Sequence, residues 1–136
     1  MLHELFEGFP EKVVWSHGVL PPDELERVRF IDYSYWNEMS GGSRRPADVL
    51  PSLRAGRPPG WVTELGTSWC FEFAAELATV PVVDDLIVMA TPGRAKLVLL
   101  EGYSRLTAIF VGGLQRRITV RAYLGLSAEI EQWGCF

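Results

Sequence analysis

The pattern of apolar and polar positions predicts a helix followed by a β-hairpin in the second half of the chain. Trp69, Phe73 and Leu77 follow one another at helical spacing, and Ser68 can cap a helix from Trp69 to Ala78. Two apolar runs, 86–90 and 96–100, flank the turn sequence Thr-Pro-Gly-Arg. The second run is apolar almost throughout, which predicts a strand buried on both faces.

The other segments are shorter, and their boundaries are marked by proline, glycine and serine. Residues 1–20 are expected to be irregular or a short strand, 23–26 a first helical turn, 28–33 a strand, 36–45 a loop around Ser-Gly-Gly-Ser, 46–54 a helix opened by Pro46 and stopped by Gly56, and 57–60 a further turn. Beyond the hairpin we expect a helix over 104–111 stopped by Gly112-Gly113, a strand over 118–123, and a short helix over 129–133 capped by Ser127. This alternation, without repeats or linkers, predicts one α/β (α+β) domain over residues 1–136, a small mixed sheet flanked by helices.

Composition and charge narrow the class of protein. A chain of 136 residues with 48% hydrophobic and 22% charged residues is typical of one globular domain. The net charge of −4 argues against a protein that coats nucleic acid without sequence preference. The N-terminus has no basic segment followed by an apolar run, and no apolar stretch is long enough to span a bilayer. We therefore expect a cytoplasmic protein without membrane contact.

The two cysteines, Cys70 and Cys135, are far apart and have no CxxC spacing, so they predict neither a zinc site nor a redox motif. Cys70 stands among Trp69, Phe71 and Phe73, where a thiol is expected to act as a small buried hydrophobe.

The strongest chemical signal is the turn Glu101-Gly102-Tyr103-Ser104-Arg105, which follows the buried strand and opens the next helix. A glycine permits the tight turn, and the unpaired N–H groups of the helix start attract an anion. Arg105 adds a cationic fork that matches phosphate oxygens. The alternative is structural, with Arg105 pairing with Glu101 across the turn.

This order of hairpin, buried strand, acidic residue, Gly102, two residues and Arg105, then a helix opening Leu-Thr-Ala, resembles the signature turn of the ParB/sulfiredoxin-like superfamily. The resemblance covers roughly residues 71–123, and it implies that fold together with a nucleoside triphosphate or diphosphate as ligand, with Mg²⁺ as a possible companion. Carried over, it implies that Gly102, Ser104 and Arg105 contact phosphate. Glu101 would hold the turn or help with a metal, and Tyr103 would be part of the binding turn.

The turn also departs from the superfamily's pattern. Tyr103 stands where a sulfiredoxin has its reactive cysteine, which argues against that chemistry. Ser104 replaces the histidine of the related free serine kinases, which puts phosphoryl transfer in doubt. No helix-turn-helix follows, so we do not expect a complete ParB.

A second candidate cluster lies in residues 36–48, where the Gly-rich loop feeds the helix that begins at Pro46. Arg44 or Arg45 can clamp a phosphate there, and Glu38 or Asp32 can ligate Mg²⁺ or act as a base. The alternative is a surface loop with solvated arginines.

These observations leave three functions open. The first is a nucleotide- or phosphate-binding domain, including a Mg²⁺-dependent small-molecule kinase or NTPase. The second is a non-enzymatic sensor or protein-interaction module, and the third is a nucleic-acid-processing or regulatory protein, against which the acidic charge counts. The sequence does not decide whether there is turnover.

Overall fold

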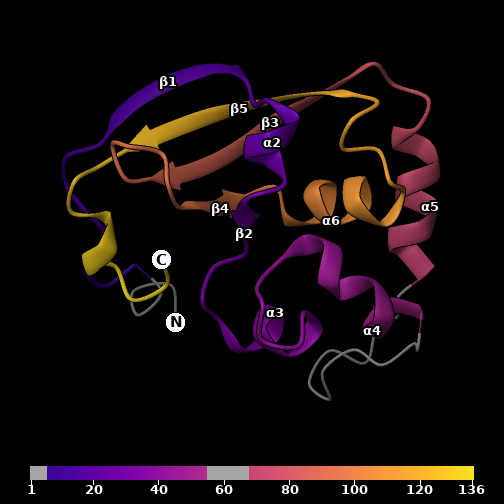
Figure 1. Cartoon of the computed structure of the whole chain (residues 1–136), viewed down its shortest axis with the longest axis horizontal. Coiled ribbons are helices and arrows are strands. Elements are labelled where there is room, and N and C mark those ends of the chain that lie inside the picture. Colours follow the sequence, from indigo (N-terminus) through magenta and orange to yellow (C-terminus); the bar gives the residue numbers. More distant parts are fainter. Residues whose placement is uncertain (1–5, 55–67) are drawn as a thin grey trace.

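The computed structural model of the chain describes residues 6–54 and 68–136. Its centre is a five-stranded mixed sheet with the strand order β1-β5-β3-β4-β2 (Figure 1). The strands are β1 (Val14–Val19), β2 (Val28–Arg29), β3 (Val82–Ala90), β4 (Leu97–Glu101) and β5 (Thr119–Leu126). Neighbouring pairs along the sheet alternate between antiparallel (β1 with β5, β3 with β4) and parallel (β5 with β3, β4 with β2). The predicted mixed sheet flanked by helices is thus confirmed, and so is the broad α/β (α+β) class.

The helices connect and cover these strands. They are α2 (Pro22–Leu25), α3 (Ser34–Met39), α4 (Leu50–Arg54), α5 (Ser68–Leu77) and α6 (Tyr103–Val111), with 3-10 turns at Pro46–Val49 and Ile130–Gln132. Among them, α5 and α6 pack on each other. None of the described helices is long and apolar enough to cross a membrane.

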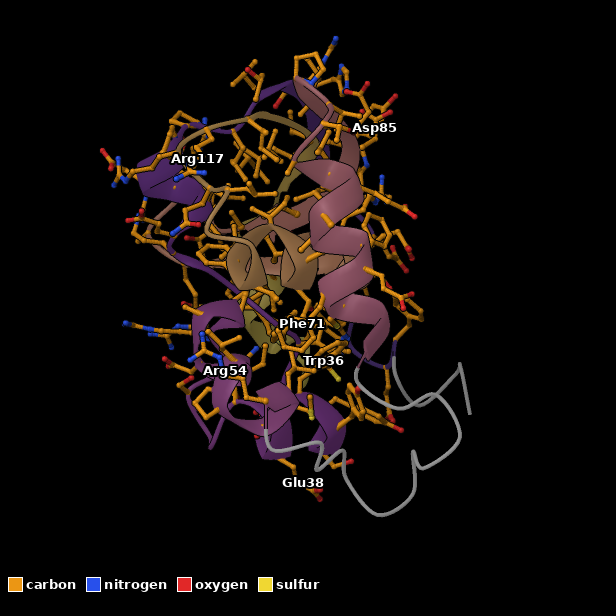
Figure 2. The ribbon with its side chains drawn as sticks, turned by 90° about the vertical axis from the view of Figure 1, so that its right-hand side faces the viewer. Trp36, Glu38, Arg54, Phe71, Asp85 and Arg117 are labelled. Carbon is orange, nitrogen blue, oxygen red and sulfur yellow. The ribbon has the colours of Figure 1, made fainter. Side chains whose placement is uncertain are left out.

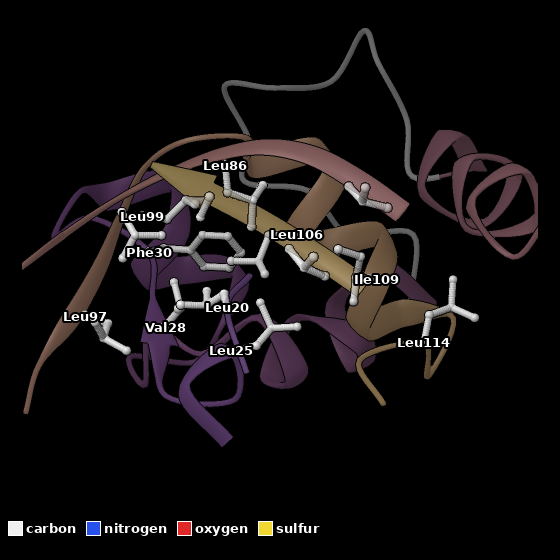
Figure 3. Packing of buried hydrophobic residues seen from close by; sticks show 14 of the residues in the cluster. Leu20, Leu25, Val28, Phe30, Leu86, Leu97, Leu99, Leu106, Ile109 and Leu114 are labelled. Atoms are coloured by element: carbon white, nitrogen blue, oxygen red, sulfur yellow. The ribbon is translucent and has the colours of Figure 1, made fainter. Parts of the chain in front are cut away.

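The two faces of the sheet have separate cores. Leu86 and Leu99 from the hairpin meet Leu106 and Ile109 of α6, and all four side chains are fully buried (Figure 3). On the opposite face, Met89 packs in a smaller cluster formed with the C-terminal segment. Because β4 lies between both cores, its first three residues are buried, as the apolar run predicted.

Several predicted elements are confirmed, although β3 begins four residues before the expected 86 and β5 ends three residues after the expected 123. The helix expected over 69–78 is α5, although the Ser68 side chain that was expected to cap it lies outside the description. The hairpin is β3 and β4, the helix expected over 104–111 is α6, and the last strand is β5. The segment expected to form a helix at 46–54 is a 3-10 turn followed by α4. The expected stop at Gly56 and the turn at 57–60 lie outside the described residues.

Two predictions about residues 28–45 are wrong. The strand expected over 28–33 pairs with β4 only at Val28 and Arg29, because the chain then leaves the sheet. The Phe30 N–H donates instead to the Arg44 carbonyl, and the Asp32 N–H donates to the Cys135 carbonyl. The loop expected over 36–45 begins as helix α3, whose residue Met39 is buried in the core.

Candidate functional site

The predicted phosphate turn is built around Gly102, which stands in the left-handed region with φ 104° and is the N-cap of α6. A β-carbon at this position would lie 2.4 Å from Leu86 Cδ2, so only glycine fits between the turn and the core. Glu101 and Ser104 are exposed beside it. The backbone thus has the shape that the sequence predicted.

Arg105 does not form the predicted alternative pair with Glu101 in the described structure. Its Nη1 donates a hydrogen bond to the backbone carbonyl of Asp84 in β3. Another guanidinium nitrogen lies 3.3 Å from the position that a β-carbon of Gly102 would occupy. The cation therefore stands over the turn while it fastens the turn to the neighbouring strand.

Tyr103 joins the turn to the second candidate cluster. Its ring stacks on Trp36 of α3 with 5.3 Å between centroids, and Trp36 stacks on Phe30 at 4.1 Å. Burial raises the pKa of the Tyr103 phenol, and Glu101 adds to this. In Figure 2, Trp36 points into the molecule. The two predicted segments therefore lie side by side, with aromatic rings packed between them.

The candidate carboxylates lie apart from this contact. Asp32 is exposed and accepts a hydrogen bond of 2.9 Å from Asn37 Nδ2. Glu38 points away from the body of the molecule (Figure 2). The described residues contain no group of three or more His, Cys, Asp or Glu side chains close enough to hold a metal ion.

Arg44 makes a structural clamp on the C-terminal segment. Its Nε donates to the Phe30 carbonyl at 2.9 Å, and its Nη2 donates to the carbonyls of Cys135 and Phe136 at 3.3 and 2.7 Å. Burial lowers the pKa of its guanidinium, while Asp32 opposes that shift. Its fork is directed at backbone oxygens of the two segments that it holds together.

Next to this clamp lies a cleft of about 680 Å³. It is lined by α2, by the end of β2, by the loop before Pro46 and by the segment that enters β4. The lining residues are Asp23, Glu26, Arg27, Arg29, Arg45, Ala95 and Lys96, four of them cations and two of them carboxylates. We call this the cationic cleft.

Only some of the charged side chains that line the cationic cleft have a partner of opposite charge. Arg116 binds both carboxylates, at 3.0 Å to Glu26 and 3.1 Å to Asp23. In contrast, Arg29, Arg45 and Lys96 have no carboxylate within ion-pair distance among the described residues, and the Lys96 ammonium lies 4.7 Å from the centroid of the Phe136 ring. An excess of positive charge therefore remains on the cleft wall.

The pKa of Lys96 is affected both by burial and by the neighbouring cations. Burial lowers the pKa of its ammonium, and the nearby cations Arg44 and Arg29 lower it further. Glu131 and Asp32 oppose the shift without overcoming it. A cation held among like charges is stabilised when an anion arrives.

Sequence reasoning found only part of this cleft. It singled out Arg45 together with Arg44, but it missed Arg27, Arg29 and Lys96. Arg27 and Arg29 stand on either side of buried Val28, and this spacing places both arginines on one side of an extended segment. Their position next to Lys96 depends on the parallel pairing of β2 with β4, which no local pattern indicates.

Comparison with known proteins adds no relative: no protein-family model, no curated protein and no solved structure matches this chain. The resemblance to the ParB/sulfiredoxin-like superfamily stays a prediction.

Proposed function

We propose that this protein binds a phosphate-bearing small molecule of the nucleotide class in the cationic cleft. The proposal rests on three cations, Arg29, Arg45 and Lys96, that line one cleft of about 680 Å³. None of them has a carboxylate partner among the described residues. The whole chain has a net charge of −4, so this local excess runs against its overall composition. A phosphate group is the anion that such a cluster recognises best, because an arginine fork matches its oxygens.

The predicted turn is the competing location for the same ligand. It offers the helix start after Gly102 and the cation Arg105, and it is the basis of the proposed ParB/sulfiredoxin-like fold. However, Arg105 already donates to the Asp84 carbonyl, whereas the guanidinium groups of Arg29 and Arg45 form no hydrogen bond or ion pair with the described residues. The cationic cleft is therefore the better-supported site.

Binding without turnover is the form of the function that the geometry supports best. A kinase or NTPase needs a carboxylate beside the reacting groups. Neither Asp32 nor Glu38 lines the cationic cleft, and the carboxylates that do line it are bound by Arg116. We therefore propose a cytoplasmic sensor or carrier of a nucleotide rather than an enzyme that converts one.

A thermal-shift screen followed by calorimetry tests the proposal. The ligands are ATP, ADP, CTP, GTP and pyrophosphate, each with and without Mg²⁺. A ligand at 100 times its dissociation constant stabilises the folded state by about 2.7 kcal/mol. The double variant Arg45→Ala/Lys96→Ala should weaken binding at least about tenfold, and binding should also weaken as salt is added.

Two further variants locate the site. Arg54→Ala/Arg117→Ala removes two cations from exposed positions outside the cleft, so it controls for the change in net charge. Arg105→Ala tests the turn. If Arg105→Ala abolishes the shift while the cleft variant keeps it, the site moves to the turn. If no ligand shifts the wild type, the nucleotide proposal fails.

A further inference from the structure

The strand β1 presents an open edge. It is the outermost strand of the sheet on its side, and all six of its residues are exposed (Figure 1). Val14, Trp15 and Val19 expose between half and three quarters of their surface. Within the described residues, its only strand partner is β5.

The backbone groups at this edge can be assigned from the alternation of an antiparallel ladder. The Leu20 N–H donates to the Val120 carbonyl at 2.8 Å, so even-numbered residues of β1 turn their backbone groups toward β5. In agreement, odd-numbered Thr119 of β5 donates to the Pro81 carbonyl on its other side. The N–H and C=O groups of Trp15, His17 and Val19 therefore face the open edge.

The edge lacks the features that usually protect an exposed strand. Natural proteins shorten such edges or place charges, prolines or bulges in them. The sequence Val-Trp-Ser-His-Gly-Val of β1 has no proline and no Lys, Arg, Asp or Glu, and its register with β5 is regular. At the opposite edge of the sheet, β2 has only two residues and includes Arg29. This contrast indicates that another strand can pair with β1 at its open edge.

We propose that two copies of this chain pair through antiparallel β1 strands to form a continuous ten-stranded sheet. A two-fold axis through His17 places Trp15 opposite Val19 of the second copy, and His17 opposite its own equivalent. With two hydrogen bonds for each outward-facing pair, this register makes about six, whereas a shift by two residues, the smallest that keeps outward-facing residues opposite each other, makes about four. The register centred on His17 therefore pairs the largest number of backbone N–H and C=O groups at the open edge.

The side chains at the edge suit a second copy of the same strand. Cross-strand pairs of an aromatic with a β-branched residue stabilise sheets, and this register contains two such pairs. The Trp15 ring is already held against Gly125, where an added β-carbon would lie 2.9 Å from its Cζ3. His17 is bonded to Asp85 at 2.9 Å, so a carboxylate lies beside each of the two facing imidazoles.

This pairing is independent of the proposed ligand site. The cationic cleft adjoins β2, at the other edge of the sheet from β1. Both clefts of a dimer would remain open. A defect in dimerisation is therefore distinguishable from a defect in ligand binding.

Sedimentation velocity over a range of protein concentrations up to about 1 mM tests the proposal, because a single pair of short strands buries little surface and associates weakly. The wild type should shift from monomer to dimer as concentration rises. Trp15→Lys/Val19→Lys should remain monomeric, because each cross-strand pair then places two lysines opposite each other. Mixed with Trp15→Glu/Val19→Glu, it should form a heterodimer.

The matched control is Phe71→Lys/Val82→Lys, which adds the same charges at exposed apolar positions of α5 and β3. It should dimerise like the wild type, and circular dichroism shows that each variant is folded. A wild type that stays monomeric throughout would overturn the proposal. So would a dimer that tolerates the β1 lysines, or one that the control disrupts equally.

Discussion

Gly102→Ala should strongly destabilise the fold, because Gly102 is buried at the start of α6. Alanine at φ 104° carries a backbone cost of about 1–2 kcal/mol. Its β-carbon would also meet Leu86 Cδ2 at 2.4 Å, and Leu86 is fully buried in the main core, so it has little room to move. Overpacking of this kind adds about 1–3 kcal/mol. We expect a total loss of about 3 kcal/mol in the free energy of unfolding.

Urea denaturation of purified variants measures this loss, and Gly113→Ala is the matched control. Gly113 also has a positive φ, of 64°, but no atom lies within 4 Å of the position of its β-carbon. It should therefore lose only the backbone part, about 1 kcal/mol. In a thermal scan the two variants should differ by several degrees. Equal losses would refute the argument that the turn is packed against Leu86.

Three further predictions follow from buried groups. Burial raises the pKa of the Cys70 thiol to about 12, so a thiol reagent should label half-buried Cys135 in the native protein and reach Cys70 only on unfolding. Arg44→Ala should cost about 2 kcal/mol in urea denaturation because three backbone carbonyls lose their donor, whereas exposed Arg45→Ala should cost under about 0.5 kcal/mol. The pKa of Tyr103 is raised above 10.0, so its phenol stabilises the fold fully below pH 10 and loses that contribution as the pH rises further; denaturation at pH 8 and pH 11 should show a smaller decline in Tyr103→Phe.

Local signals in the sequence predicted the second half of the fold well. The periodic apolar residues of α5, the Pro-Gly turn of the hairpin and the glycines that bound α6 are each decided by residues a few positions apart. For the same reason the turn at Gly102 was predicted with its correct backbone shape.

The first half was predicted less well because long-range contacts decide it. Phe30 and Ile31 continue the apolar pattern of a strand, but they are buried in two different clusters after the backbone has left the sheet. The cationic cleft is likewise formed by contacts between residues that are far apart in the sequence. Arg29 and Lys96 come together only through the pairing of β2 with β4, and the signal at Arg45 alone did not reveal them.

The attachment of α2 and β2 to the hairpin has a consequence for how the chain folds. Arg27 donates to the carbonyls of Arg94 and Ala95, and Glu24 pairs with Arg94 at 2.6 Å, although these partners stand about seventy positions apart in the sequence. Closing so long a loop is slow and follows the formation of local structure. The segment from β3 to β5 should therefore form first, and the N-terminal third should dock onto it afterwards. The cationic cleft exists only once that docking is complete. A bound anion would therefore stabilise the docked state, which is the product of the last folding step.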